Sequence, residues 1–253
     1  MSWVLRLPVP WMGLVIFAGI YLIAAVVFFI ATKLIRDRSR VVDPGILSPL
    51  GVVFGLLVVF TAAQVWADLE RANSAVADEA SALRDVVLLA NSLSEDENST
   101  LRALIRAHIF TAENEEWPAM ARGDAVVAMP TPLRRVLQEV LAFPTIDDLR
   151  KTAIINALQK SLDARRQRIV ISQSTVSGVR WLGLLLTGLC VLIGIALVHL
   201  DNLRNCGVAL ALFATGMAAS ILIISAHSRP FSGAVTPALL HRIAADLSPY
   251  TDD

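Results

Sequence analysis

Four long stretches of this chain contain no Asp, Glu, Lys or Arg, and they constrain the fold more than any other feature of the sequence. They cover residues 7–32, 44–67, 181–200 and 205–228, which are 26, 24, 20 and 24 residues long. A helix needs about 20 mostly apolar residues to cross the hydrocarbon core of a bilayer. Each stretch is rich in Leu, Val, Ile, Ala and Phe, so the sequence predicts an all-α membrane protein with four transmembrane helices.

The segment between the second and third stretches has a different composition. Residues 67–177 hold 16 acidic and 13 basic side chains, as a water-exposed helical domain would. We therefore expect transmembrane helices 1 and 2 in residues 1–66, a soluble helical domain in residues 67–177, a transmembrane hairpin in residues 178–226 and a polar C-terminal tail in residues 227–253. This mild negative charge gives no sign of a nucleic-acid surface, so no nucleic-acid partner is expected.

The second transmembrane helix is expected to continue into the soluble domain without a break. Small and apolar residues recur every three or four positions beyond Trp66, with charged residues between them. These positions are Leu69, Ala72, Val76, Ala80, Leu83, Val87 and Ala90. Neither Pro nor Gly interrupts residues 56–91, so one helix half in lipid and half in water is the simplest interpretation.

Local signals mark the remaining helices of the soluble domain. Ser94 followed by Glu97 fits a capping box and predicts a helix start. Trp117-Pro118 is expected to break that helix, and residues 123–129 to form a loop. Thr131-Pro132 predicts the next start, because Pro is tolerated in the first helical turn. The last soluble helix is expected to begin at Thr145.

The sequence contains no constellation that indicates catalysis or a cofactor. It lacks a glycine-rich phosphate loop, HExxH, CxxC and GxSxG, so we expect neither an enzyme nor a metal or cofactor site. The four histidines are isolated, and His108, on an apolar helix face, is interpreted as a packing residue. No ionisable residue lies inside a span, which disfavours a transporter that uses buried carboxylates.

Two sets of polar residues lie near the predicted membrane boundaries. Thr61 and Gln64 are the polar residues toward one end of the second span. Four arginines form a predicted basic cluster at the membrane surface, where cations suit the phosphate layer. These arginines are Arg165, Arg166, Arg168 and Arg180. Gly51 and Gly55 form a GxxxG pair, which fits either packing within the bundle or an oligomer contact.

The order of elements and several segments resemble a known family. Residues 51–73 read GVVFGLLVVFTAAQVWADLERAN, and the chain also holds Glu115-Glu116-Trp117-Pro118, an arginine-rich entry through Trp181, and Pro230-Phe231-Ser232-Gly233. Over residues 46–240 these resemble the bacterial bestrophin-like domain family and, more distantly, the bestrophin anion channels. The resemblance implies a homo-oligomer in the bilayer, a pentamer by analogy, that passes small anions.

The resemblance also implies pore residues. Three bulky apolar residues, spaced by four on the second helix, form the neck in bestrophins, and without gaps they fall on Val52, Leu56 and Phe60. The match departs from the bacterial bestrophins after Phe60, where their Arg and Trp-Trp pair are replaced by Thr61 and Leu69-Glu70. Channel activity is therefore implied by analogy.

The leading hypothesis is a bestrophin-like channel for small anions such as chloride, located as a multi-pass protein in the bacterial inner membrane. The alternative is a non-conducting sensor or scaffold whose helical domain binds a ligand or partner. Membrane orientation stays open, because Lys33 and the arginines after it favour cytoplasmic connectors, whereas the bestrophin layout places the soluble domain in the cytoplasm.

Overall fold

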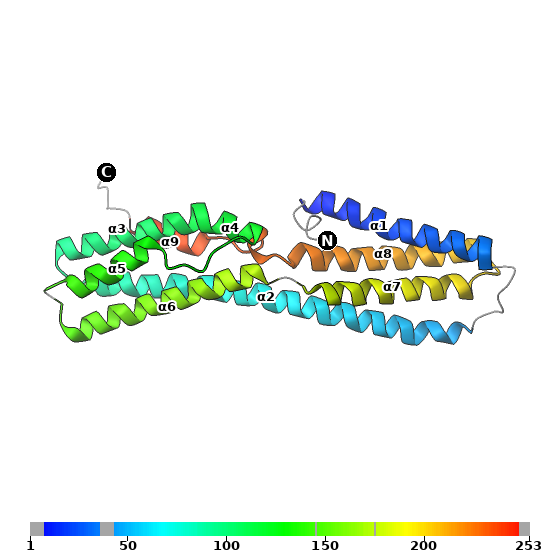
Figure 1. Cartoon of the computed structure of the whole chain (residues 1–253), viewed down its shortest axis with the longest axis horizontal. Helices are drawn as coiled ribbons and strands as arrows, with labels where there is room; N and C mark the ends of the chain where they lie inside the picture. The colour runs from blue at the N-terminus through cyan, green and yellow to red at the C-terminus, as the bar shows by residue number, and fades with distance from the viewer. Residues whose placement is uncertain (1–7, 36–42, 145, 175, 248–253) are drawn as a thin grey trace. The chain divides into compact units, whose positions relative to one another are not determined.

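The computed structural model describes residues 8–35, 43–144, 146–174 and 176–247, and this part of the chain is built from helices and connecting turns (Figure 1). The elements in chain order are α1 (Val9–Ile30), η2 (Ala31–Ile35), η3 (Pro44–Ile46), α2 (Leu47–Ala90), α3 (Glu95–Thr111), η4 (Ala112–Glu116), α4 (Trp117–Arg122), α5 (Thr131–Ala142), α6 (Asp148–Gln173), α7 (Gly178–Val198), α8 (Leu203–His227), η5 (Pro230–Ser232) and α9 (Ala238–Asp246).

Two compact units share this chain. Unit 1 comprises Met1–Ala67 and Thr175–Ser228, and unit 2 comprises Asp68–Ser174 and Arg229–Asp253. Four helices in the described residues are long and apolar enough to cross a membrane, as the four charge-free stretches predict. The helix α2 contributes residues to both units and has no break between Leu47 and Ala90, as its periodicity predicts.

Unit 1 contains α1, the first half of α2, α7 and α8. One face of α1, formed by Met12, Ile16, Ile20 and Ala24, is buried, because residues four apart lie on the same side of a helix. This helix packs along α8. The rings of Phe54 and Phe213 also bring α2 and α8 together, with centroids 5.3 Å apart.

Unit 2 is a helical bundle with its own apolar core. The predicted capping box starts α3: Ser94 Oγ accepts from the Glu97 backbone N–H, and Glu97 accepts from the Ser94 N–H. Apolar residues from four helices are fully buried in the core. They are Leu83 and Val86 of α2, Leu101, Ile105 and Ile109 of α3, Leu133, Val136 and Val140 of α5, and Ile154 and Ile169 of α6.

The predicted break at Trp117-Pro118 is wrong. The chain stays helical through the π-helical turn η4 and into α4, which ends at Gly123 with a φ of 81°. Proline is tolerated at the start of a helix, where its missing N–H is not needed, and Pro118 lies in the first turn of α4. The wider π turn thus lets one helical path continue where an α-helix would have been interrupted.

The end of the chain differs from the expected polar tail. Residues 229–247 belong to unit 2, where Phe231 packs edge-on against Trp117 with ring centroids 5.5 Å apart. The indole N–H of Trp117 donates to the Val235 carbonyl at 3.3 Å. Leu240 and Ile243 of α9 are buried. The apolar side of this short amphipathic segment thus packs on the bundle of unit 2.

Candidate functional site: an exposed apolar face and a buried ion cluster

The first half of α2 presents an apolar face that no other part of the described chain covers. Val52, Leu56 and Phe60 are 58%, 50% and 69% exposed. Because a helix has 3.6 residues per turn, positions spaced by four lie within about 80° of one another. The three side chains named from the resemblance therefore share one open face of unit 1.

The two glycines of the GxxxG pair lie on the same half of α2. A Cβ atom added at Gly51 or Gly55 would meet no atom within 4 Å. Neither glycine therefore serves a close approach to another described part of this chain. Gly188 of α7 does, since a Cβ there would lie 2.4 Å from the end of Met217 and 3.3 Å from Phe54.

Thr61, one of the two polar residues predicted toward the end of this span, does not extend the exposed face. It lies nine residues from Val52, about half a turn around the helix. Its side chain is buried, and its hydroxyl donates to the Leu57 carbonyl at 2.7 Å. Gln64 is half-buried, and its side-chain oxygen accepts a hydrogen bond from Arg180 of α7.

Two members of the predicted surface cluster of arginines lie in the core of unit 2. The side chain of Arg168 is fully buried and that of Arg165 almost so, whereas Arg166 and Arg180 are exposed. The membrane-surface prediction is thus wrong for Arg165 and Arg168. The helix α6 continues to Gln173, so these arginines lie more than one turn before its end, on the side that faces acidic partners.

Glu79 of α2 is the centre of this buried group. One of its oxygens accepts from Arg168 Nε at 2.8 Å, and the other accepts from Arg168 Nη2 at 3.2 Å. Both side chains have no exposed surface. This two-point geometry, in which the planar guanidinium matches a carboxylate, joins α2 to α6 across 89 residues of sequence.

Glu116 of η4 completes the group. It accepts from Arg168 Nη2 at 2.9 Å and from Arg165 Nε at 2.9 Å, so it bridges the two arginines. Arg165 also donates to the Ala128 carbonyl at 2.8 Å. Two carboxylates and two guanidiniums therefore balance in charge within the core. We call Glu79, Glu116, Arg165 and Arg168 the ion cluster.

His108 and Trp117 flank the ion cluster. The Nε2 atom of buried His108 lies 3.2 Å from Glu79 Oε1. An ionised carboxylate can only accept, so Nε2 carries the proton and donates. The other ring nitrogen has no hydrogen-bond partner among the described residues. The Trp117 ring lies under Arg168, 4.9 Å from the guanidinium carbon, which adds a cation–π contact.

The surroundings of Glu79 keep its carboxyl group ionised. Burial by itself would raise the pKa, but the positive charge of Arg168 and the hydrogen bond from His108 oppose burial and bring the pKa below its usual value. The ion cluster thus ties α2 to α6, to α3 through His108, and to η4 through Glu116. Sequence reasoning missed it, since no local spacing connects residues 79, 116 and 168.

No arrangement in the described residues indicates a metal centre. In residues 8–35, 43–144, 146–174 and 176–247, no group of three or more His, Cys, Asp or Glu side chains is placed to hold a metal ion. Cys190 is exposed on α7, and Cys206 is buried in α8. The features that remain for function are the exposed face of α2 and the ion cluster that holds the second half of the same helix.

The described residues thus form an all-helical protein with four helices apolar enough to span a membrane. The chain belongs to the bestrophin-like domain family, whose model matches residues 14–236. No curated protein matches the chain.

Solved structures share the fold at low sequence identity. A bacterial bestrophin homologue from Klebsiella pneumoniae matches with a TM-score of 0.70 and 12% identity, over 92% of this chain and 96% of that chain. A single-substitution variant of that homologue matches with a TM-score of 0.71 and 12% identity, over 94% of this chain and 99% of that chain. A structure described as a variant of a membrane protein matches with a TM-score of 0.72 and 14% identity, over 95% of this chain and 98% of that chain.

Proposed function

We propose that the protein is an oligomeric channel in which the exposed apolar face of α2 lines the pore and through which small anions such as chloride pass. The observation that carries the proposal is the face formed by Val52, Leu56 and Phe60, which the other described parts of the subunit leave uncovered. Family membership and the shared fold with bacterial bestrophin homologues support a channel. The bacterial inner membrane is the proposed location.

A pore of this kind requires several subunits. One helix face can bound a continuous path only when copies of it surround an axis, and closed rings are the usual symmetric solution. The open surroundings of Gly51 and Gly55 leave the backbone of α2 accessible to a neighbouring subunit. A pentamer is proposed by analogy with the bestrophins.

The proposed neck has no fixed charge. Three apolar side chains set conductance by the width of the constriction and by whether water fills it. Selection between anions and cations would then depend on groups outside the neck. The ion cluster would hold the extension of α2 in unit 2 against α6 and thereby fix the register of the helix that lines the pore.

A non-conducting sensor is the second candidate, and a groove of about 440 Å³ in unit 2 favours it. The groove lies between α2 and the C-terminal segment and includes the polar side chains of Glu70, Asn73 and Thr236. A small polar ligand could bind there without any conduction. The experiment below separates the two candidates because it measures flux and oligomer size on the same sample.

The test is chloride flux from liposomes that contain the purified full-length protein. Wild type should pass chloride and exclude large cations. Replacement of Val52, Leu56 and Phe60 by Ala should widen and wet the neck and raise the flux. The matched control replaces three equally exposed leucines on α7 and α8, Leu182, Leu186 and Leu212, by Ala and should leave the flux unchanged.

Two outcomes oppose the proposal. Absence of chloride flux from wild type and from the triple variant, with the oligomer size unchanged, would exclude the channel and favour the sensor. An equal rise in flux from the control variant would show that the neck lies elsewhere. The triple variant should still fold, because these side chains are exposed in the subunit. Truncation of a fully buried leucine to Ala, by contrast, lowers the free energy of unfolding by about 2–5 kcal/mol.

A further inference from the structure

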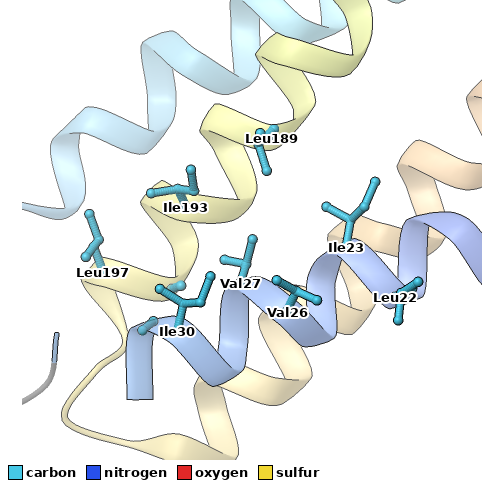
Figure 2. Close-up of a pocket in the computed structure, with 10 residues that line it drawn as sticks. Leu22, Ile23, Val26, Val27, Ile30, Leu189, Ile193 and Leu197 are labelled. Atoms are coloured by element: carbon cyan, nitrogen blue, oxygen red, sulfur yellow. The ribbon is translucent and has the colours of Figure 1, made fainter. Parts of the chain in front are cut away.

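Unit 1 contains an apolar groove of about 460 Å³ between α1 and η2 on one side and α7 on the other. Figure 2 shows the side chains that line it. They come from residues 22–31 and 189–197, and every one is Leu, Ile, Val or Ala. The helix α1 packs along α8. The groove lies between the C-terminal half of α1 and the C-terminal half of α7.

The length of the groove matches one leaflet of a bilayer. Residues 22–31 extend over about 14 Å at 1.5 Å per residue, and residues 189–197 over about 12 Å. The hydrocarbon core is about 30 Å thick, so one leaflet contributes about 15 Å. Both lining segments end near the connectors that follow α1 and α7. In a bilayer, a groove of this length that ends near the span connectors would extend through a single leaflet, with one end near the membrane surface.

The floor and rim of the groove differ in exposure. Ala31 and Ala196 are buried at the floor, and their small side chains give the groove its depth. Leu22, Val26 and Ile193 are 66%, 49% and 41% exposed and form the rim. In a bilayer this hollow has no polar group to hold water, and its walls gain dispersion contacts only when another apolar chain fills it.

A cation stands at the surface end of the groove. Lys33 is exposed and lies in η2, two positions after Ala31, which is the last lining residue on this side of the groove. A lysine at this depth extends its ammonium to the interface, where phosphates lie. The other described charged residues of the two span connectors, Asp43, Asp201 and Arg204, are exposed and do not line the groove.

We propose that this groove binds one acyl chain of a membrane phospholipid, with the phosphate of that lipid beside Lys33. The cation at the surface end of the groove matches the phosphate of a lipid, and a helix from a second subunit is the other occupant that the test considers. The lipid site does not depend on conduction, and its test does not measure flux.

The test uses the full-length protein in phosphatidylethanolamine–phosphatidylglycerol vesicles that contain a small fraction of phosphatidylglycerol with a photoreactive group on one acyl chain. After illumination, the labelled residues are mapped by peptide mass spectrometry. Label should concentrate on residues 22–31 and 189–197 relative to the exposed leucines of α8. Even labelling of all exposed apolar surfaces would overturn the proposal, because it would show no preferred site.

Variants then test the two parts of the site. Ile193→Trp and, from the opposite wall, Val26→Trp should fill the groove and abolish the preferred labelling. The control Leu212→Trp places the same ring on an exposed position of α8 and should leave it intact. Lys33→Gln should lower the labelling about fivefold at subsaturating lipid, as expected for one basic residue near anionic phosphate.

Failure would be recognisable even if a tryptophan variant did not fold, because Lys33 is exposed and its replacement leaves the helices intact. Unchanged labelling of the groove in Lys33→Gln would overturn the assignment of the phosphate. Subunit-to-subunit cross-links from Ile193→Cys, with no lipid label on residues 189–197, would show that a second copy fills the groove and would overturn the proposal as a whole.

Discussion

The two halves of α2 belong to one helix but bury different kinds of side chain. Residues 47–67 contain no ionisable group and expose Val52, Leu56 and Phe60. Residues 68–90 expose charged side chains such as Glu70 and Arg84, and bury a carboxylate, that of Glu79. The outer face of the first half is apolar, as the proposed pore neck requires, whereas the outer face of the second half is polar, as a surface in contact with water usually is.

The comparison shows which half of this helix fixes its register against the neighbouring helices. The buried face of the first half packs through apolar shape alone, as Phe54 does against Phe213. The second half adds a charged pair whose two-point geometry admits one register. A buried charge without its partner is far more costly than a lost apolar contact, so the second half should be much more sensitive to single substitutions.

The largest effect is expected from Glu79→Ala, measured as the loss in free energy of unfolding of unit 2. This change leaves Arg168 with one carboxylate partner instead of two and removes the acceptor of His108. Breaking a buried ion pair by removing one partner costs about 3–5 kcal/mol. Thermal unfolding in a mild detergent, followed by amide exchange in residues 68–90, gives the readout.

The matched control is Glu70→Ala on the same helix. Glu70 is exposed, so its loss should change stability by less than about 0.5 kcal/mol. Equal and small effects at both positions would show that the second half of α2 is held by apolar packing, like the first. The contrast drawn between the two halves would then be mistaken.

A smaller difference is expected between two adjacent arginines on α6. Arg165→Ala removes a buried partner of Glu116 and the donor to the Ala128 carbonyl. It should cost about 3 kcal/mol, the low end for a buried pair, because Glu116 keeps Arg168. Arg166→Ala removes an exposed side chain and should lie within about 0.5 kcal/mol of wild type.

This pair also tests the sequence-based interpretation of the arginines as a surface cluster. If all of them met lipid phosphate, both substitutions would leave the stability of unit 2 unchanged. Different unfolding temperatures for the two variants, measured at the same detergent concentration, would instead support the buried arrangement of Arg165.

Part of the loss of folding stability at low pH should come from protonation of Glu79. Its pKa is lower in the folded protein than in the unfolded chain, where it lies near 4.5. The stability that it contributes is therefore complete above pH 4.5 and is lost as the pH falls from 4.5 through the folded pKa. Unfolding midpoints measured between pH 7 and pH 3 should fall less steeply below pH 4.5 in Glu79→Gln than in wild type.

An identical slope in both proteins would mean that Glu79 binds protons equally in the folded and unfolded states. The exposed carboxylate of Glu70 provides the control, since Glu70→Gln should retain the wild-type slope.

These features were not equally accessible from the sequence. The four spans could be predicted because gaps without charge longer than about 20 residues have few other structural explanations. The course of α2 could also be predicted from its spacing, and the start of α3 from Ser94 and Glu97, because helix periodicity and capping are local. The exposed face of α2 was named through a resemblance, since an apolar helix offers many triplets with the same spacing.

The ion cluster could not be predicted, because its partners are brought together by the tertiary fold. Glu79 and Arg168 are 89 residues apart and look like ordinary surface residues in their own helices. Periodicity placed Arg165 and Arg168 near a helix end, whereas α6 extends to Gln173 and turns both toward the core. The position of the C-terminal segment was missed for the same reason, since its contact with Trp117 is also long-range.

The smallest effect, and the finest test of the comparison, is a pair of identical substitutions in the two halves of α2. Val86 is fully buried in unit 2, and Val59 is 60% exposed in unit 1. Val86→Ala should cost roughly 1–3 kcal/mol, from the lost burial of two methyl groups and the cavity left behind. Val59→Ala should leave the unfolding of the isolated subunit within about 0.5 kcal/mol of wild type. Unfolding and oligomer size are then measured together. If Val59→Ala costs as much as Val86→Ala and also dissociates the oligomer, the exposed face of α2 is covered by a neighbouring subunit, and the pore must be lined by other residues.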